Sequence, residues 1–206
     1  MPIILFFHGN GETARDYDGL SDEYRSLPVY FIVADYRGYG PSTGSPSVSS
    51  FLSDAHLCLD ETMRLVSGQG FNGPLVVMGR SLGSAPALEL ASSRSNDIAA
   101  LVIESGFARL VPLLDLMGIP ASRLGITEDD GPRNLEKMGR IDKPTLILHA
   151  ERDEIIPIAD AELLHEACKD PSKIFVRVPR AGHNDIQISA GSMYFDAIRD
   201  LLNRVR

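Results

Sequence analysis

Residues 75–91 read LVVMGRSLGSAPALELA, and this stretch decides the fold. Its first four residues form a short apolar run typical of a buried strand, whereas residues 82–91 have the small side chains and spacing of a helix. Between them, Gly79-Arg80-Ser81-Leu82-Gly83 has the form G-x-S-x-G. A serine on a tight strand-to-helix turn has a strained backbone, and glycines on either side give the turn room. The stretch therefore predicts a serine hydroxyl at the carboxyl edge of a sheet.

Six apolar runs of this kind recur along the chain. They are short, rich in β-branched residues and mostly apolar at consecutive positions, as expected of strands covered on both faces: Ile3–Phe7, Val29–Asp35, Leu75–Gly79, Ala100–Glu104, Thr145–His149 and Ile174–Val178. Helical spacing is seen in four stretches between or after them: Phe51–Val66 with Ser49 or Ser50 as its N-cap, Leu82–Ala91, Ile158–Cys168 and Met193–Val205. Alternating strands and helices predict an α/β fold with a mostly parallel six-stranded sheet.

Length and composition place the chain among ordinary globular domains. Its 206 residues are 44% hydrophobic and 23% charged, which predicts a single domain over residues 1–206. The net charge of −8 disfavours binding to nucleic acid, and no apolar run reaches the ~20 residues of a membrane span. The two cysteines, Cys58 and Cys168, show no metal-ligand spacing and make no disulfide framework, so we expect no metal and a reducing, cytoplasmic location.

A serine hydroxyl needs a base before it can act as a nucleophile at neutral pH. His183 follows the last predicted strand, in Pro179-Arg-Ala-Gly-His-Asn-Asp, and therefore lies at the edge that carries Ser81. The other four histidines are expected to be structural, two within helices and two at strand ends: His56, His165, His149 and His8. His183 is the predicted base.

The base in turn needs a carboxylate that orients its ring. Asp153 stands a few residues past the fifth predicted strand, at the same edge of the sheet. The chain order Ser81, Asp153, His183 is one of the three known orders of such a triad. The rival acids are Glu104, Glu151 and Glu154, of which Glu104 is expected to pair with Arg80 instead, because neighbouring strand ends place the two close together.

Two backbone N–H groups are expected to form an oxyanion hole. The first belongs to Leu82, the residue after the nucleophile. The second is expected from the glycine-containing loop His8-Gly9-Asn10-Gly11, where Asn10 is the preferred donor and Gly11 the alternative.

Residues 106–141 break the alternation of strands and helices. This segment is rich in glycine and proline, and only Leu110–Met117 has a helical pattern. An insertion of this length in a compact domain is more often functional than idle, so it is predicted to be a small cap. Five apolar side chains in it are candidates for an acyl pocket, the alternative being that they merely pack on the sheet: Phe107, Leu110, Leu113, Leu114 and Met117.

The chain resembles the α/β-hydrolase superfamily over nearly its whole length. The resemblance is carried by HGNG (8–11), DYRGYGPSTG (35–44), GRSLGS (79–84), HAERDEIIP (149–157) and GHND (182–185). It is closest in kind to the small bacterial relatives of the eukaryotic protein depalmitoylase group. The resemblance implies a three-layer sandwich with Ser81 as nucleophile, Asp153 as acid, His183 as base, and Asn10 with Leu82 as the oxyanion pair. It also implies that residues 35–40 form a structural loop, in which we expect Asp35 and Arg37 to make a local ion pair and a turn.

One departure from the superfamily concerns the front of the sheet. The superfamily's sheet usually opens with an antiparallel strand pair, whereas here the strand that leads to HGNG starts near position 2. We therefore expect the front pair to be lacking, or to lie in a segment upstream that would also bear on localisation. An uncovered sheet edge raises the hypothesis of a homodimer.

These residues together predict a serine hydrolase. The expected reaction is cleavage of a small-molecule carboxylic ester or acyl thioester through an acyl-enzyme on Ser81, with no cofactor. An amidase or peptidase is the alternative within catalysis. The alternative outside catalysis is a binding protein that keeps the hydrolase scaffold, because a fold alone does not fix a function.

Overall fold

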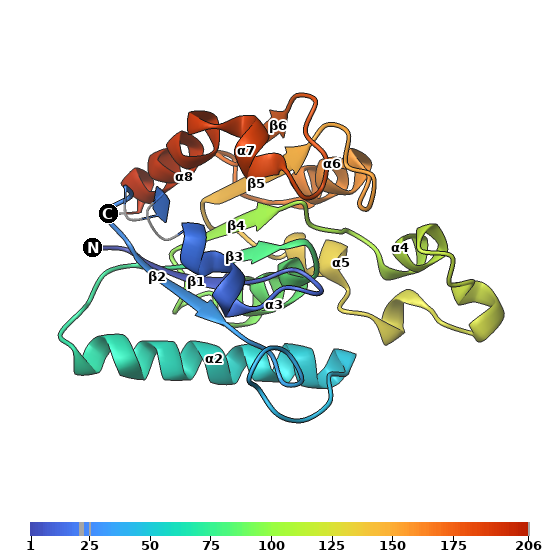
Figure 1. Cartoon of the computed structure of the whole chain (residues 1–206), viewed down its shortest axis with the longest axis horizontal. Coiled ribbons are helices and arrows are strands. Elements are labelled where there is room, and N and C mark those ends of the chain that lie inside the picture. Colours follow the sequence, from blue (N-terminus) through green and yellow to red (C-terminus); the bar gives the residue numbers. More distant parts are fainter. Residues whose placement is uncertain (21–22, 25, 206) are drawn as a thin grey trace.

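Six parallel strands form one sheet in the order β2-β1-β3-β4-β5-β6 (Figure 1). The computed structural model describes residues 1–20, 23–24 and 26–205. The strands are β1 (Ile3–Phe7), β2 (Tyr30–Ala34), β3 (Leu75–Arg80), β4 (Ala100–Glu104), β5 (Thr145–Ala150) and β6 (Ile174–Val178). The predicted six-stranded parallel sheet is confirmed, with strand ends within one residue of those expected from the sequence.

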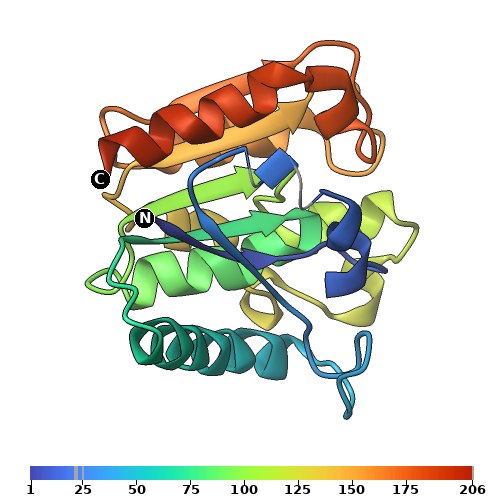
Figure 2. The same cartoon turned by 60° about the vertical axis from the view of Figure 1, so that its left-hand side comes forward.

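Helices cover both faces of the sheet (Figure 2). One face is covered by α2 (Val48–Gly68), α3 (Ser84–Ser93), α5 (Asn134–Met138) and α6 (Ile158–Ala167). The other is covered by η1 (Ala14–Leu20), α7 (Ile186–Ala190) and α8 (Ser192–Arg204). This is the three-layer arrangement that the resemblance to the α/β hydrolases implies.

The strands read as continuous apolar runs because their two faces belong to two separate cores. Leu5 and Val77 pack under α2 and α3, whereas their neighbours Phe6 and Met78 belong to the core on the other face, where Phe6 packs against Tyr17 of η1. Each of these four side chains is fully buried. A strand that is buried on both faces has no polar face to present, which explains the lack of alternation in the sequence.

Helix α2 begins earlier than predicted. Its N-cap is Ser47, not Ser49 or Ser50, because Ser47 has extended backbone angles and its hydroxyl accepts from the Ser50 N–H. The Ser50 hydroxyl accepts in return from the Ser47 N–H, which completes a capping box. Three serines close together in the sequence left the choice of cap ambiguous.

The pairing predicted between Asp35 and Arg37 is wrong. Arg37 instead forms a bidentate pair with Asp54 on α2, with Nε 2.6 Å from Oδ2. Asp35 accepts from the Ala14 N–H at 2.8 Å, and its Oδ1 lies 3.2 Å from His8 Nε2. The loop therefore joins β1, η1 and α2 to one another through contacts that are distant in sequence.

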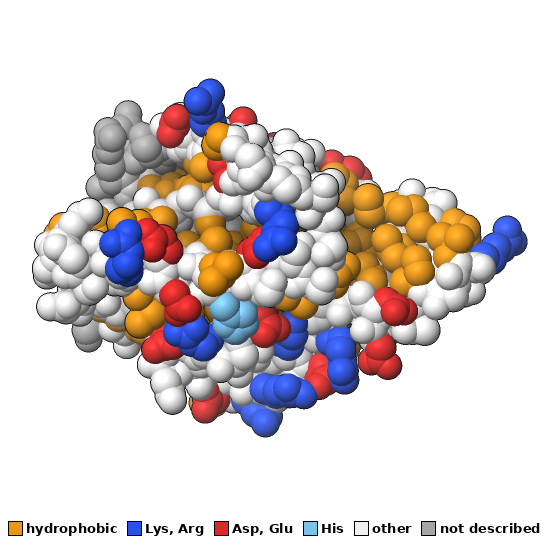
Figure 3. All heavy atoms as spheres, turned by 90° about the horizontal axis from the view of Figure 1, so that it is seen from below, with side chains coloured by type: hydrophobic (Ala, Val, Ile, Leu, Met, Phe, Trp, Pro, Cys, Tyr) orange, Lys and Arg blue, Asp and Glu red, His pale blue; other side chains and the backbone are white. Residues whose placement is uncertain are grey.

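Residues 109–131, here called the arm, project from the body of the molecule at the right of Figure 1. The arm contains α4 (Leu110–Leu116), η3 (Ala121–Leu124) and η4 (Glu128–Asp130), of which the sequence predicts only the first. The Glu128 carboxylate joins its two ends, since it accepts from the N–H groups of Leu110 and Val111 at 2.9 Å each. Figure 3 shows apolar side chains gathered over this projection, and four large ones are exposed: Leu116, Met117, Ile119 and Leu124.

Candidate active site

Ser81 stands on the turn between β3 and α3, with a backbone that L-amino acids rarely adopt. Its φ is 52°, and a short 3₁₀ turn, η2 (Ser81–Gly83), leads into α3. The flanking glycines are needed for space. A Cβ at Gly79 would lie 2.1 Å from the Gly83 carbonyl oxygen, and a Cβ at Gly83 would lie 2.0 Å from the Phe7 carbonyl oxygen. The strain therefore persists because the packing around the turn leaves no alternative.

The structure brings together the three residues that the sequence places at one edge. His183 Nε2 lies 3.0 Å from Ser81 Oγ. On the other side of the ring, His183 Nδ1 lies 2.9 and 2.8 Å from the two carboxylate oxygens of Asp153. Ser81, His183 and Asp153 form a row of three groups. His183 is 3% exposed and Ser81 8%, so the row is shielded from solvent but a substrate can reach its serine end. A hydroxyl, an imidazole and a carboxylate in this order can carry a proton away from the hydroxyl.

The carboxylate of Asp153 is fixed by backbone donors. Its Oδ1 accepts from the N–H groups of Ile155 and Ile156 at 3.0 and 2.8 Å. Burial alone would raise the pKa of Asp153, but the hydrogen bonds from His183 and Ile156 outweigh it and hold the pKa below its usual range. The carboxylate therefore stays ionised at neutral pH.

The loop after β1 lies against the turn that carries Ser81. The close approach of Gly83 to the Phe7 carbonyl fixes this contact. Asn10 and Leu82, the two predicted backbone donors, line the same hollow as Ser81. The Asn10 side chain is turned to another partner, since its Oδ1 accepts from Tyr39 Oη at 2.7 Å. This hydrogen bond fixes the side chain of Asn10 against Tyr39.

A hollow of about 480 Å³ opens beside Ser81 and His183. All five residues predicted for the acyl pocket line it, namely Phe107, Leu110, Leu113, Leu114 and Met117. Leu82, Ile155 and Ile156 also line it, although the sequence analysis did not assign Ile155 or Ile156 a role. The only signal for these two was their position beside Asp153. The walls are mostly apolar, with Asn10, Arg80 and Asn184 as the polar exceptions near the serine.

None of the rival acids is bonded to the ring of His183. Glu104 is fully buried and lies 3.2 Å from Arg80 Nε, which confirms the predicted pair. Glu151 accepts from the Arg180 N–H at 3.2 Å, and Glu154 from the His183 backbone N–H at 3.1 Å.

Three of the other four histidines have hydrogen-bond partners away from Ser81. His8 Nδ1 donates to the Gly9 carbonyl at 2.8 Å, so it shapes the first loop as expected. His56 Nε2 lies 3.2 Å from Glu89, and His149 Nε2 donates to the Ile156 carbonyl at 2.9 Å. His149 belongs to the same sequence motif as Asp153, but it is a buried structural residue.

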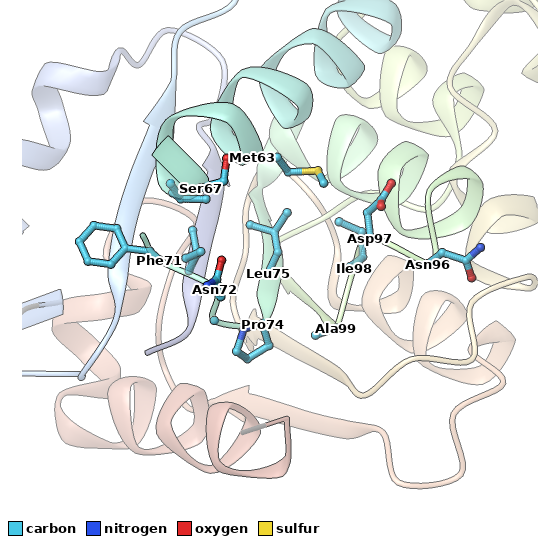
Figure 4. A pocket seen from close by; sticks show the side chains of 13 residues that line it. Met63, Ser67, Phe71, Asn72, Pro74, Leu75, Asn96, Asp97, Ile98 and Ala99 are labelled. Atoms are coloured by element: carbon cyan, nitrogen blue, oxygen red, sulfur yellow. The ribbon is translucent and has the colours of Figure 1, made fainter. Parts of the chain in front are cut away.

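A second hollow, of about 460 Å³, lies at the opposite edge of the sheet (Figure 4). It is bounded by the end of α2 and the starts of β3 and β4, with Met63, Phe71 and Leu75 on its walls. Its acidic residue, Asp97, is paired with Arg94 at 2.7 Å. Ser81 follows the carboxyl end of β3, whereas this hollow lies at the amino end of the same strand. The length of β3 therefore separates the two.

Comparison with known proteins identifies the family. The model of the family described as serine aminopeptidase, S33 matches residues 2–125, and the chain belongs to this family of α/β hydrolases. The protein bem46 of Schizosaccharomyces pombe is 31% identical over 209 residues, covering 98% of this chain and 67% of the yeast protein. The chain thus spans about two thirds of that relative.

Solved structures agree on the fold. A monoacylglycerol lipase of Paleococcus ferrophilus superposes with a TM-score of 0.76 at 17% identity, covering 99% of this chain and 95% of the lipase. A thermophilic esterase of Thermogutta terrifontis gives a TM-score of 0.71 at 19% identity, covering 100% of this chain and 90% of the esterase. At such identities the likeness shows the α/β-hydrolase fold alone.

Three further observations concern features outside the site. Within residues 1–20, 23–24 and 26–205, no helix is both long and apolar enough to cross a membrane. In the same described residues, no group of three or more histidine, cysteine, aspartate or glutamate side chains is arranged to hold a metal ion. Cys58 and Cys168 are both free thiols.

Proposed function

We propose that this hydrolase cleaves carboxylic esters or acyl thioesters through an acyl-enzyme on Ser81. The observation that carries the proposal is the row from Ser81 Oγ through the His183 ring to Asp153, with contacts of 3.0 and 2.8 Å. These distances are within hydrogen-bond reach, which is what a nucleophile and its base require.

The reaction follows from the positions of the three groups. Ser81 Oγ attacks the substrate carbonyl, and its proton passes to His183 Nε2. Asp153 holds Nδ1–H of the ring and stabilises the imidazolium that forms. The oxyanion of the tetrahedral intermediate accepts from the N–H groups of Asn10 and Leu82. His183 then gives its proton to the leaving alcohol or thiol, and water repeats the sequence to release the acid and restore Ser81.

The apolar hollow beside Ser81 favours a substrate whose acyl group is apolar and binds in the hollow. A chain of methylenes is desolvated against Phe107, Leu113 and Leu114, which line the hollow. Esters and thioesters fit this site best, because their leaving groups need little protonation. In this account residues 106–141 are a small cap inserted into a single domain over residues 1–206, and the cap supplies most of the apolar wall.

Peptide or amide cleavage is the second candidate. The matching family bears the description serine aminopeptidase, and the proposed acyl-enzyme chemistry also applies to amides. The apolar walls favour the ester reading, because an aminopeptidase must bind the charged amino terminus of its substrate. A binding protein on the same scaffold is the remaining alternative. The predicted homodimer and the absence of a nucleic-acid partner stay predictions.

A substrate panel separates these candidates. p-Nitrophenyl esters from acetate to palmitate, an acyl-CoA series and aminoacyl p-nitroanilides are assayed in parallel on the wild-type chain and on Ser81→Ala. We expect hydrolysis of esters and thioesters that depends on Ser81. Faster turnover of the anilides than of the matched esters would move the assignment to the peptidase. Equal rates for wild type and Ser81→Ala would remove Ser81 as nucleophile.

A further inference from the structure

The guanidinium of Arg80 bonds to three other segments of the candidate site. Its Nε lies 3.2 Å from Glu104 Oε1 at the end of β4, and its Nη1 pairs with Glu12 in the loop after β1. Its Nη2 donates both to the His183 carbonyl at 3.0 Å and to Asn184 Oδ1 at 3.1 Å. Arg80 is only 7% exposed. The residue directly before Ser81 therefore holds the main chain of the loop that carries His183.

The two carboxylates that hold Arg80 are themselves fixed by other donors. Glu12 Oε2 accepts from the Gly9 N–H at 2.7 Å and from Tyr17 Oη at 2.6 Å. Glu104 Oε2 accepts from Tyr194 Oη, on α8, at 2.6 Å. Nε and Nη1 of Arg80 therefore bond to carboxylates whose own positions are fixed. Nη2 bonds to the loop that carries His183 and can fix the position of that loop.

We propose that Arg80 is a positioning residue that fixes the His183 loop and the loop after β1 relative to Ser81. The proposal rests on the proposed function, in which His183 is the base and Asn10, two residues before Glu12, supplies an oxyanion donor. Arg80 occupies the first variable position of the G-x-S-x-G pattern, and from the sequence only its pairing with Glu104 is expected.

The planar fork of arginine suits this role. Nε and Nη1 point to the two carboxylates while Nη2 points to a carbonyl and an amide oxygen, which are four acceptors on four residues. A lysine carries its donors on one nitrogen and cannot span these segments at once. Without the guanidinium, the His183 carbonyl loses its donor and the two carboxylates lose the cation between them. The ring of His183 would then be free to move relative to Ser81 Oγ.

A displacement of this kind has a defined kinetic effect. Misplacing a reacting group by about 1 Å costs about 10²-fold in rate. The apolar walls of the hollow keep their residues, because they come mostly from the cap and from residues 155–156, whereas Arg80 and Asn184 line only its polar end beside Ser81. The loss is therefore expected in kcat, with KM nearly unchanged.

The test compares Arg80→Met, Arg80→Lys and Asn184→Ala with wild type. The control is Arg94→Met, which removes an arginine that pairs with Asp60 and Asp97 far from Ser81. kcat and KM for p-nitrophenyl butyrate are normalised to the folded fraction. The proton on His183 Nδ1, bonded to Asp153, is followed by NMR as a downfield resonance. A residue that contributed only to stability would lower the melting temperature but move neither kcat per folded molecule nor this resonance.

We expect Arg80→Met to lose about 10- to 100-fold in kcat with KM within about threefold, and the resonance to shift or broaden. Arg80→Lys should recover part of the loss, and Asn184→Ala should lose less than Arg80→Met. Wild-type kcat and an unchanged resonance in folded Arg80→Met would overturn the proposal. If that variant does not fold, unchanged values in both Arg80→Lys and Asn184→Ala overturn it.

The two proposals fail in different ways. If wild type cleaves no ester or thioester, the proposed function fails, and the resonance still reports whether Arg80 holds the ring of His183. If wild type is active and the Arg80 variants behave like Arg94→Met, only the role of Arg80 fails.

Discussion

His149 Nε2 lies 3.5 Å from Oδ2 of Asp153, the carboxylate that also bonds to His183. His149 is fully buried, and its Nε2–H donates to the Ile156 carbonyl at 2.9 Å. Its Nδ1 has no hydrogen-bond partner among the described residues. The neutral ring therefore supports the turn that presents Asp153.

The buried state of His149 predicts a pH-dependent stability. Burial lowers the pKa of His149, and the Ile156 carbonyl and Asp153 only partly oppose this. Between the ordinary histidine pKa, about 6.5, and the lower folded value, the unfolded chain binds a proton that the folded chain does not. The free energy of unfolding therefore falls as the pH is lowered through that window. Urea unfolding at pH 7.5 and 5.5 should show a smaller fall for His149→Gln than for wild type. An identical fall in both would show that another group is responsible.

The glycines around Ser81 predict a contrast between two alanine substitutions. Gly79→Ala places a Cβ 2.1 Å from a backbone oxygen that cannot move aside, and should destabilise the fold by at least about 2 kcal/mol. Gly68→Ala, in α2, meets no atom within 4 Å and should stabilise by about 0.5–1 kcal/mol. Chemical denaturation measures both. Equal effects of the two substitutions would contradict the packing described around the turn.

The apolar hollow predicts a change in chain-length preference. Leu114→Trp places a large ring in the hollow, so the optimum of a p-nitrophenyl ester series should move to shorter acyl chains, with kcat/KM for the longest esters falling about tenfold or more. Leu124→Trp is the matched control, because Leu124 is 62% exposed on the arm and does not line the hollow. A chain-length profile that shifts in both variants, or in neither, would separate the acyl site from this hollow.

The row of three residues predicts non-additive losses. Ser81→Ala, His183→Ala and the triple variant with Asp153→Asn should each lose kcat by a similar factor, about 10⁴–10⁶, because the three groups act as a unit. Glu151→Gln, which alters a rival acid whose side chain accepts from the Arg180 N–H and is not bonded to the His183 ring, should keep wild-type kcat. Losses that add from variant to variant would indicate independent roles.

Much of this arrangement is readable from the sequence because it depends on local patterns. Consecutive apolar residues in Leu75–Met78 predict a buried strand, and the glycines on either side of Ser81 predict the turn. Chain order then places His183 and Asp153 at the same edge. The helix start at Ser47 was missed, since three nearby serines can each cap a helix.

The network behind Ser81 is not readable from the sequence. Glu12, Arg80 and Tyr194 come from three segments, and only the fold brings them together. The sequence predicts a pair between Arg37 and Asp35, its near neighbour, whereas the partner of Arg37 is Asp54, which lies 17 residues further along the chain in α2. Ion pairs between distant segments leave no periodic or spacing signal, so such pairs require a structure.

Fluorophosphonate labelling tests whether Ser81 is the activated nucleophile. The native chain is treated with a fluorophosphonate and the modified peptide is identified by mass spectrometry. We expect one adduct, on Ser81, that is absent from His183→Ala and from the denatured chain. An intact, folded wild-type chain that takes no label on Ser81, or takes it equally after denaturation, would contradict the account.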